Sequence, residues 1–121
     1  MFAVYINTDI IQFVKPITFL GDSLEAIRSF APDARRAVGF QLDKVQRGED
    51  PDDWKPIKTV GPGVREIRVR DDNGAFRVLY VAQFAEAVYV LHAFQKKSQK
   101  TPRIHLERAR SYHRELLRTR R

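Results

Sequence analysis

The sequence predicts a single domain of the α+β class with the element order β-α-α-β-β-β-α. Two observations predict it: amphipathic helical patterns lie near both ends of the chain, and three strand patterns follow one another between residues 64 and 94. The chain of 121 residues is long enough for one hydrophobic core. The expected architecture is a sheet with two helices packed on one face.

The first strand is predicted over Pro16–Leu20 and ends at Gly21. Asp22 or Ser23 can cap the helix that follows, because both side chains accept hydrogen bonds from free backbone N–H groups. The apolar positions of this helix are Leu24, Ile27 and Phe30.

A second helix is predicted to open at Pro32, with Asp33 available as its cap, and to end at Gly48. Steps of four, four and three residues place its apolar positions on one face. These positions are Ala34, Val38, Leu42 and Val45. The turn-rich segment Glu49–Gly63 is interpreted as a connector.

Three strands are then predicted. Val64–Arg70 alternates between apolar and polar residues, and Asp72-Asn73-Gly74 predicts a hairpin, because Asn-Gly accepts the positive φ angles of a tight turn. Ala75–Ala82 is the second strand. Ala87–Phe94 is the third, and because it is apolar on both faces we expect it near the centre of the sheet.

From Arg103 the pattern becomes helical, with one stripe of arginines and an opposite apolar side. The stripe comprises Arg103, Arg110, Arg114, Arg118 and Arg121, and the apolar side Ala109, Tyr112 and Leu116. Residues 1–14 are interpreted as an N-terminal extension or an extra strand, which leaves 15–121 as the domain with its basic C-terminal helix.

The net charge of +7 is concentrated at the C-terminus. Residues 96–121 hold ten Lys or Arg and two Glu, a net charge of +8, whereas the first 95 residues carry −1. Such one-sided charge indicates an acidic partner. The chain has no cysteine, which excludes disulfides and thiol nucleophiles and fits a reducing cytoplasm. No apolar stretch is long enough to predict a membrane span.

Familiar catalytic motifs are absent from the sequence, which has no P-loop, GxGxxG, HExxH or GxSxG pattern. The three histidines lack the spacing of metal ligands, so neither a metal nor a cofactor is expected. His92 lies in an apolar strand, where a hydrogen-bonded structural histidine is commoner than a catalytic one. Trp54 is likewise more typical of a core or lid aromatic than of a base-stacking ring.

The remaining candidates are cationic. Arg77 stands alone in an apolar strand, and it either pairs with Glu66 or Asp71 across the hairpin or binds a ligand. Arg68 and Arg70 share one face of the neighbouring strand. If Arg77 lies on that face, the sheet presents an array of guanidinium groups, whose forks match the geometry of phosphate.

The stretches GPGVREIRVRDDNGAFRVLYVA and VYVLHAFQKKSQKTP resemble the RelE/ParE superfamily of toxin–antitoxin toxins, and more closely its HigB-like, phage-derived branch. The resemblance extends over residues 15–115. It implies a RelE-like fold with a curved, mainly antiparallel sheet, two N-terminal helices and a C-terminal helix. It also implies a toxin whose RelE and HigB relatives cleave messenger RNA on the ribosome without a metal.

The resemblance also implies roles for individual residues. Arg77 would stabilise the phosphate, and Lys96 and Lys97 would contact it, one of them as an acid. His92 is the base candidate by its chemistry. The residues implied in RNA binding are Arg68, Arg70, Phe94, Gln95, Gln99, Lys100, Arg103 and Arg110.

The implied partners are messenger RNA, the ribosome with its RNA, and a helix-turn-helix antitoxin in a heteromeric complex such as a heterotetramer. No membrane partner is expected. Two other functions stay open at this point: inhibition of DNA gyrase in the manner of ParE, and RNA binding without catalysis by a phage-derived protein.

Overall fold

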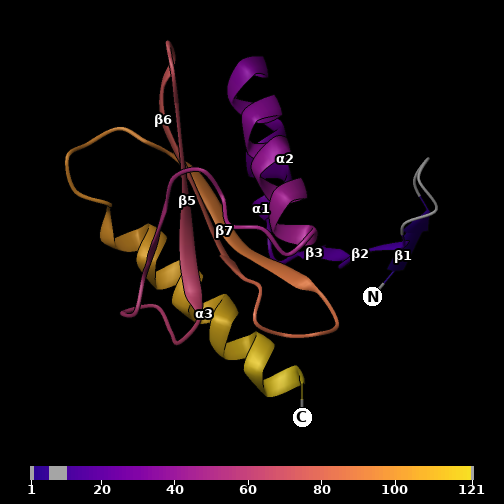
Figure 1. Cartoon of the computed structure of the whole chain (residues 1–121). Coiled ribbons are helices and arrows are strands. Elements are labelled where there is room, and N and C mark those ends of the chain that lie inside the picture. The colour runs from indigo at the N-terminus through magenta and orange to yellow at the C-terminus, as the bar shows by residue number, and fades with distance from the viewer. Residues whose placement is uncertain (1, 6–10, 121) are drawn as a thin grey trace.

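The computed structural model describes residues 2–5 and 11–120 of the chain, and it confirms the mixed α+β class (Figure 1). The described helices and strands are β1 (Phe2–Tyr5), β2 (Ile11–Val14), β3 (Ile17–Phe19), α1 (Ser23–Arg28), α2 (Pro32–Gln46), β4 (Trp54–Pro56), β5 (Val64–Asp71), β6 (Gly74–Val81), β7 (Val88–Lys96) and α3 (Arg103–Thr119).

The main sheet has five strands in the order β3-β7-β6-β5-β4. β3 pairs with β7 in parallel, and the other three pairs are antiparallel. β7 therefore lies between β3 and β6, as its apolar character predicted. β1 and β2 form a separate two-stranded sheet within the segment predicted as an extension or an extra strand, of which residues 1 and 6–10 lie outside the described residues.

The sheet is covered on both faces. α1 and α2 pack on one face, against a core that includes Ile67, Phe76 and Val78. α3 packs on the other face, where Ala109 and Leu116 contact a second core cluster. Figure 1 shows α3 crossing one end of this face while the β5–β6 hairpin extends beyond it. The two faces are therefore unequal, because α3 leaves the hairpin end open.

Four local predictions need correction. The β5–β6 turn is centred on Asp72 and Asn73, because Asp71 already pairs with Gly74 and its Oδ1 accepts a hydrogen bond from the Asn73 backbone N–H at 2.7 Å. Asp33 does not cap α2. Ala31 occupies the cap position with Pro32 in the first turn, and Asp33 pairs with Arg36 instead.

The connector between α2 and β5 was interpreted as turn-rich, but its residues Trp54–Pro56 pair with β5 as the edge strand β4. On α3, the buried positions are Ala109, His113 and Leu116, so His113 takes the place predicted for the half-buried Tyr112. His113 is buried because Gly61 lets the connector approach the helix closely. A Cβ at Gly61 would lie 2.3 Å from the His113 ring.

Replacing Gly61 with alanine is expected to destabilise the fold by roughly 1–3 kcal/mol, because the added methyl group overpacks this contact. The matched control is Gly39→Ala on α2, where a Cβ would meet nothing within 4 Å. That variant is expected to stabilise the protein by about 0.5–1 kcal/mol through helix propensity. Urea unfolding measures both. Equal effects at the two positions would contradict the packing described here.

Candidate functional site

The register of the three central strands places cationic side chains in neighbouring rows on the face that α3 covers. Arg68 lies opposite Arg77, which lies opposite Phe94. One row nearer the hairpin, Arg70 and Lys96 flank Ala75. The sequence left open whether Arg77 lies on the same face as Arg68 and Arg70, and the strand register shows that it does.

A groove is present where α3 leaves this face open. It contains two adjoining hollows of about 500 and 260 Å³. We call their combined lining the cationic groove; it comprises Asp53, Arg68, Val69, Arg70, Gly74, Ala75, Arg77, Lys96, Lys97, Ser98 and Gln99. Five of these side chains are cationic and one is acidic, so the groove is suited to an anion with several charges.

Glu66 lies beneath the cationic groove and offsets part of its positive charge. Its side chain is 2% exposed, and its Oε1 lies 3.5 Å from Arg68 Nε and 3.6 Å from Arg77 Nε. Neither Nε atom has a hydrogen-bond partner among the described residues, so the attraction is that of an ion pair. Glu66 therefore holds two guanidinium groups that would otherwise repel each other across adjacent strands.

Arg77 is fixed in place as well as paired. Its side chain is buried, and its Nη1 donates a hydrogen bond to the carbonyl of Phe76 at 3.1 Å. Burial lowers the pKa of the Arg77 guanidinium and the Glu66 carboxylate opposes that shift. An arginine remains cationic at neutral pH despite such a shift. Arg77 is thus a rigid positive charge at the floor of the groove.

The bulge in β7 brings His92 to the α3 face. The pairing with β6 shifts by one residue between Leu79 and Tyr80, which leaves Leu91 unpaired and places His92 opposite Leu79. His92 Nε2 lies 2.8 Å from Nδ1 of His105 on α3. Burial, followed by the His105 charge, lowers the pKa of His92 to about 4, and burial also lowers the pKa of His105. His92 joins α3 to the sheet as a neutral side chain.

Phe94 does not present a free face to a ligand. It is 5% exposed, and the His105 ring stacks on it at 4.0 Å between centroids with 5° between the planes. The predicted stacking of an RNA base on Phe94 would require His105 to move. Gln95 faces the other side of β7 and donates a hydrogen bond to the Asn73 carbonyl at 3.0 Å, so it holds the hairpin turn.

The remaining predicted residues fall into two groups. Lys96, Lys97 and Gln99 line the groove, whereas Lys100 and Arg103 lie beyond its lining. Arg103 is 91% exposed and pairs with Glu107. Arg110 donates a hydrogen bond to the Thr59 carbonyl at 3.0 Å.

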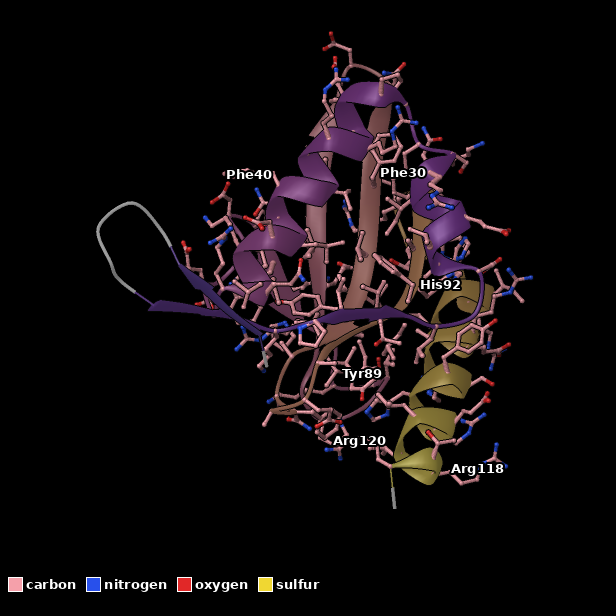
Figure 2. The ribbon with its side chains drawn as sticks, turned by 90° about the vertical axis from the view of Figure 1, so that its right-hand side faces the viewer. Phe30, Phe40, Tyr89, His92, Arg118 and Arg120 are labelled. Carbon is pink, nitrogen blue, oxygen red and sulfur yellow. The ribbon has the colours of Figure 1, made fainter. Side chains whose placement is uncertain are left out.

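Part of the arginine stripe is therefore structural, since Arg110 fastens α3 to the connector. Just after α3, Arg120 binds Glu86 in the link between β6 and β7, with bonds of 2.6 and 2.9 Å. These bonds lower the pKa of Glu86 to about 2. Figure 2 shows Arg120 turned beneath the sheet and Arg118 on the outer side of α3. Arg121 lies outside the described residues.

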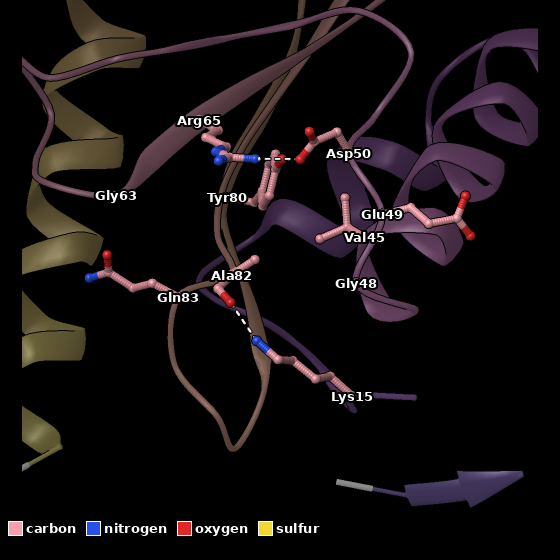
Figure 3. A pocket seen from close by; sticks show the side chains of 10 residues that line it. All are labelled: Lys15, Val45, Gly48, Glu49, Asp50, Gly63, Arg65, Tyr80, Ala82 and Gln83. Carbon is pink, nitrogen blue, oxygen red and sulfur yellow. Dashed lines mark hydrogen bonds and ion pairs between the residues drawn. The ribbon is translucent and has the colours of Figure 1, made fainter. Parts of the chain in front are cut away.

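A separate cavity of about 390 Å³ lies on the opposite face, between the end of α2 and β6 (Figure 3). Its two cations already have partners. Lys15 donates to the Ala82 carbonyl, while Arg65 pairs with Asp50 at 2.9 Å and lies 3.9 Å above the Trp54 ring. With both charges satisfied, this cavity is a poorer site for a polyanion than the groove. The Arg65 contact also gives Trp54 a structural role.

Sequence reasoning did not single out Asp53 and His105 as site residues. Asp53 joins the groove because β4 pairs with β5, and β4 was predicted as part of a loop. His105 meets His92 only because of the bulge, which sequence alternation does not reveal. In residues 2–5 and 11–120, no group of three or more His, Asp or Glu side chains could hold a metal ion.

The same part of the chain contains no helix long and apolar enough to cross a membrane.

The sequence model of the family described as "Phage derived protein Gp49-like (DUF891)" matches residues 25–113. That segment begins within α1, ends within α3 and includes every residue of the groove lining. The family is a toxin–antitoxin-associated family of RelE-like toxins. No curated protein matches the chain.

Replacing Glu66 with glutamine is expected to lower the free energy of unfolding by roughly 2–4 kcal/mol, because it leaves Arg77 buried without its counter-charge. Glu115→Gln on the exposed side of α3 is the control and is expected to change it by less than about 0.5 kcal/mol. Chemical denaturation tests both variants. A Glu66→Gln variant as stable as the control would show that the ion pair does not support the sheet.

The free energy of unfolding is expected to fall as the pH is lowered, because the His92 side chain takes up a proton more readily in the unfolded chain. Its pKa is about 4 in the folded protein and about 6.5 when unfolded, so the unfolded chain binds more protons between these values. Folding therefore loses up to about 1.4 kcal/mol per pH unit as the pH falls through this window. The check is urea unfolding at pH 7 and pH 5, with His92→Gln as the comparison. Between pH 7 and pH 5, the free energy of unfolding of the wild type should fall by about 1–2 kcal/mol more than that of the variant. Equal losses would show that His92 is not the group responsible.

Proposed function

The chain belongs to the phage-derived Gp49-like family, and from that premise we propose that it is the toxin of a type II toxin–antitoxin system, of the HigB-like branch, which cleaves messenger RNA on the ribosome. The observation that carries the proposal is the cationic groove on the open end of the sheet. The groove lies within the segment that matches the family.

RNA cleavage by its own 2′-hydroxyl builds negative charge on a pentacoordinate phosphorus. A site that catalyses it must stabilise that charge and supply a base and an acid. In this proposal Arg77 stabilises the phosphorus oxygens. It is suited to that role because its position is already fixed by Glu66 and the Phe76 carbonyl, so little reorganisation is needed during the reaction.

The other cations of the groove are more exposed than Arg77. Arg68 is about one-third exposed and can fork onto the same phosphate, whereas Lys96 and Lys97 lie at the end of β7, where the chain leaves the sheet. The two lysines would bind the phosphates and deliver a proton to the leaving oxygen. No bound metal is needed in this scheme, because arginine and lysine supply the positive charge.

The cationic groove is also a surface at which an antitoxin could neutralise the toxin. An antitoxin that covers it with acidic side chains would compete directly with RNA phosphates. We propose that a helix-turn-helix antitoxin does this in a heteromeric complex, with Lys97 and Gln99 on the exposed rim within its reach.

The double variant Lys96→Ala/Lys97→Ala is expected to lose growth arrest on induction and to lower the rate of message cleavage at least about 100-fold, because it removes two cations from the groove. The control Arg35→Ala/Arg36→Ala removes two exposed cations from α2 on the opposite face and should remain toxic. Primer extension on translated message measures cleavage.

A fully toxic Lys96→Ala/Lys97→Ala variant would contradict the site. Growth arrest with intact messages and double-strand DNA breaks would instead support inhibition of gyrase. Steep, salt-dependent RNA binding by a wild-type protein that never cuts would support an RNA-binding protein without catalysis.

A further inference from the structure

Asp53 is the one carboxylate in the lining of the cationic groove. It precedes β4, and its backbone carbonyl accepts a hydrogen bond from the Arg68 backbone N–H at 2.9 Å. This bond fixes the residue at the edge of β5, beside the hollow of about 260 Å³. Asp53 is exposed, and it shares that hollow with Arg68, Arg70, Arg77 and Lys96.

Three neighbouring carboxylates, those of Asp50, Asp52 and Glu66, have cationic partners. Asp50 pairs with Arg65 at 2.9 Å, and Asp52 with Lys44 at 2.6 Å. Glu66 is buried between two arginines. In the described part of the chain, the Asp53 carboxylate makes no hydrogen bond and no ion pair, although four cations line the same hollow. Its oxygens therefore remain available to a ligand.

An unpaired carboxylate in this position opposes phosphate binding, because its charge repels the phosphate that the neighbouring cations attract. It forms no ion pair with another described residue, and its charge acts on the fold by opposing, in part, the lowered pKa of Arg77. Its placement is explained if it takes part in the chemistry that follows binding. A carboxylate beside a phosphate site has an obvious use when the nucleophile is a hydroxyl group, since the hydroxyl must lose its proton.

The predicted base, His92, is poorly placed for that task. It is 2% exposed, and its Nε2 is bonded to His105. Its other ring nitrogen, Nδ1, is buried and has no hydrogen-bond partner among the described residues. The Nδ1 of His105 is occupied by the same bond. Proton transfer from a ligand in the groove to His92 would therefore require the packing of α3 to open.

We propose that Asp53 is the general base of the reaction; this inference rests on the proposed function. The carboxylate takes the proton of the 2′-hydroxyl, and the 2′-oxygen then forms a bond to phosphorus. The bond between phosphorus and the 5′-oxygen breaks, and that oxygen takes a proton from the Lys96 ammonium group. The products are a 2′,3′-cyclic phosphate and a 5′-hydroxyl, and Asp53 and Lys96 recover their charges by proton exchange with water.

The test separates binding from cleavage with the isosteric variant Asp53→Asn. RNA affinity is measured with a message fragment that carries 2′-deoxyribose at the cut site, and cleavage by primer extension on translating ribosomes under single-turnover conditions. The variant is expected to bind the fragment several-fold more tightly, because a repelling charge is gone, and to cleave about 100-fold or more slowly. Asp53→Glu keeps a carboxylate and should retain more cleavage than Asp53→Asn.

The control is Asp72→Asn, which removes an exposed carboxylate from the hairpin turn outside the groove lining and should cleave like the wild type. An Asp53→Asn variant that cleaves at the wild-type rate overturns the inference, and so does an Asp53→Glu variant no more active than Asp53→Asn. A wild-type protein that cuts no translated message overturns the proposed function instead, and this is seen before any variant is made.

Discussion

The cationic groove depends on the buried carboxylate of Glu66, which pairs with both Arg68 and Arg77. Arg68 and Arg77 occupy directly opposed positions on neighbouring strands, where like charges repel. Glu66 lies one row below them, almost fully excluded from water, with one oxygen within 3.6 Å of both Nε atoms. Its negative charge allows a guanidinium pair to be built into the centre of a sheet, and so makes the floor of the groove possible.

Arg68 and Arg77 lie on a sheet face that α3 covers at one end and leaves open at the other. One end is closed by α3, whose Ala109 and Leu116 enter the second core cluster. Polar contacts fasten the helix at several levels, through the His92–His105 pair near its start and Arg120–Glu86 at its end. The hairpin end stays open and concentrates the cations. A helix placed one or two turns further along the sheet would bury the groove, so the contacts that position α3 also determine the site.

Much of this arrangement could be predicted from the sequence. Strand alternation places Arg68 and Arg70 on one face, and the hairpin signal at residues 72–74 brings β6 beside β5. The position of Lys96 and Lys97 at the end of an apolar strand predicts cations at the sheet edge. These predictions succeed because a periodicity of two residues is imposed by the strand backbone itself.

The parts that could not be predicted depend on contacts remote in sequence. The bulge in β7 reverses the alternation after Leu91, so the pairing of His92 with His105 has no signal in the sequence. The edge strand β4 has only three residues and includes a proline, a composition typical of a loop. Asp53 enters the groove through that strand. Arg110 was predicted as part of the exposed arginine stripe of α3, but its side chain holds the helix to the connector.

Whether the cationic groove binds RNA phosphates is measured by the salt dependence of binding to single-stranded RNA. Five cations line the groove, and each phosphate contact contributes about −0.7 to the slope of log K against log salt concentration, so we expect a slope of about −3 to −3.5. Arg70→Gln should reduce its magnitude by about 0.7, while Arg36→Gln on α2 should leave it unchanged. A slope near zero, or one that responds to Arg36 and not to Arg70, would show that the groove does not bind the RNA phosphates.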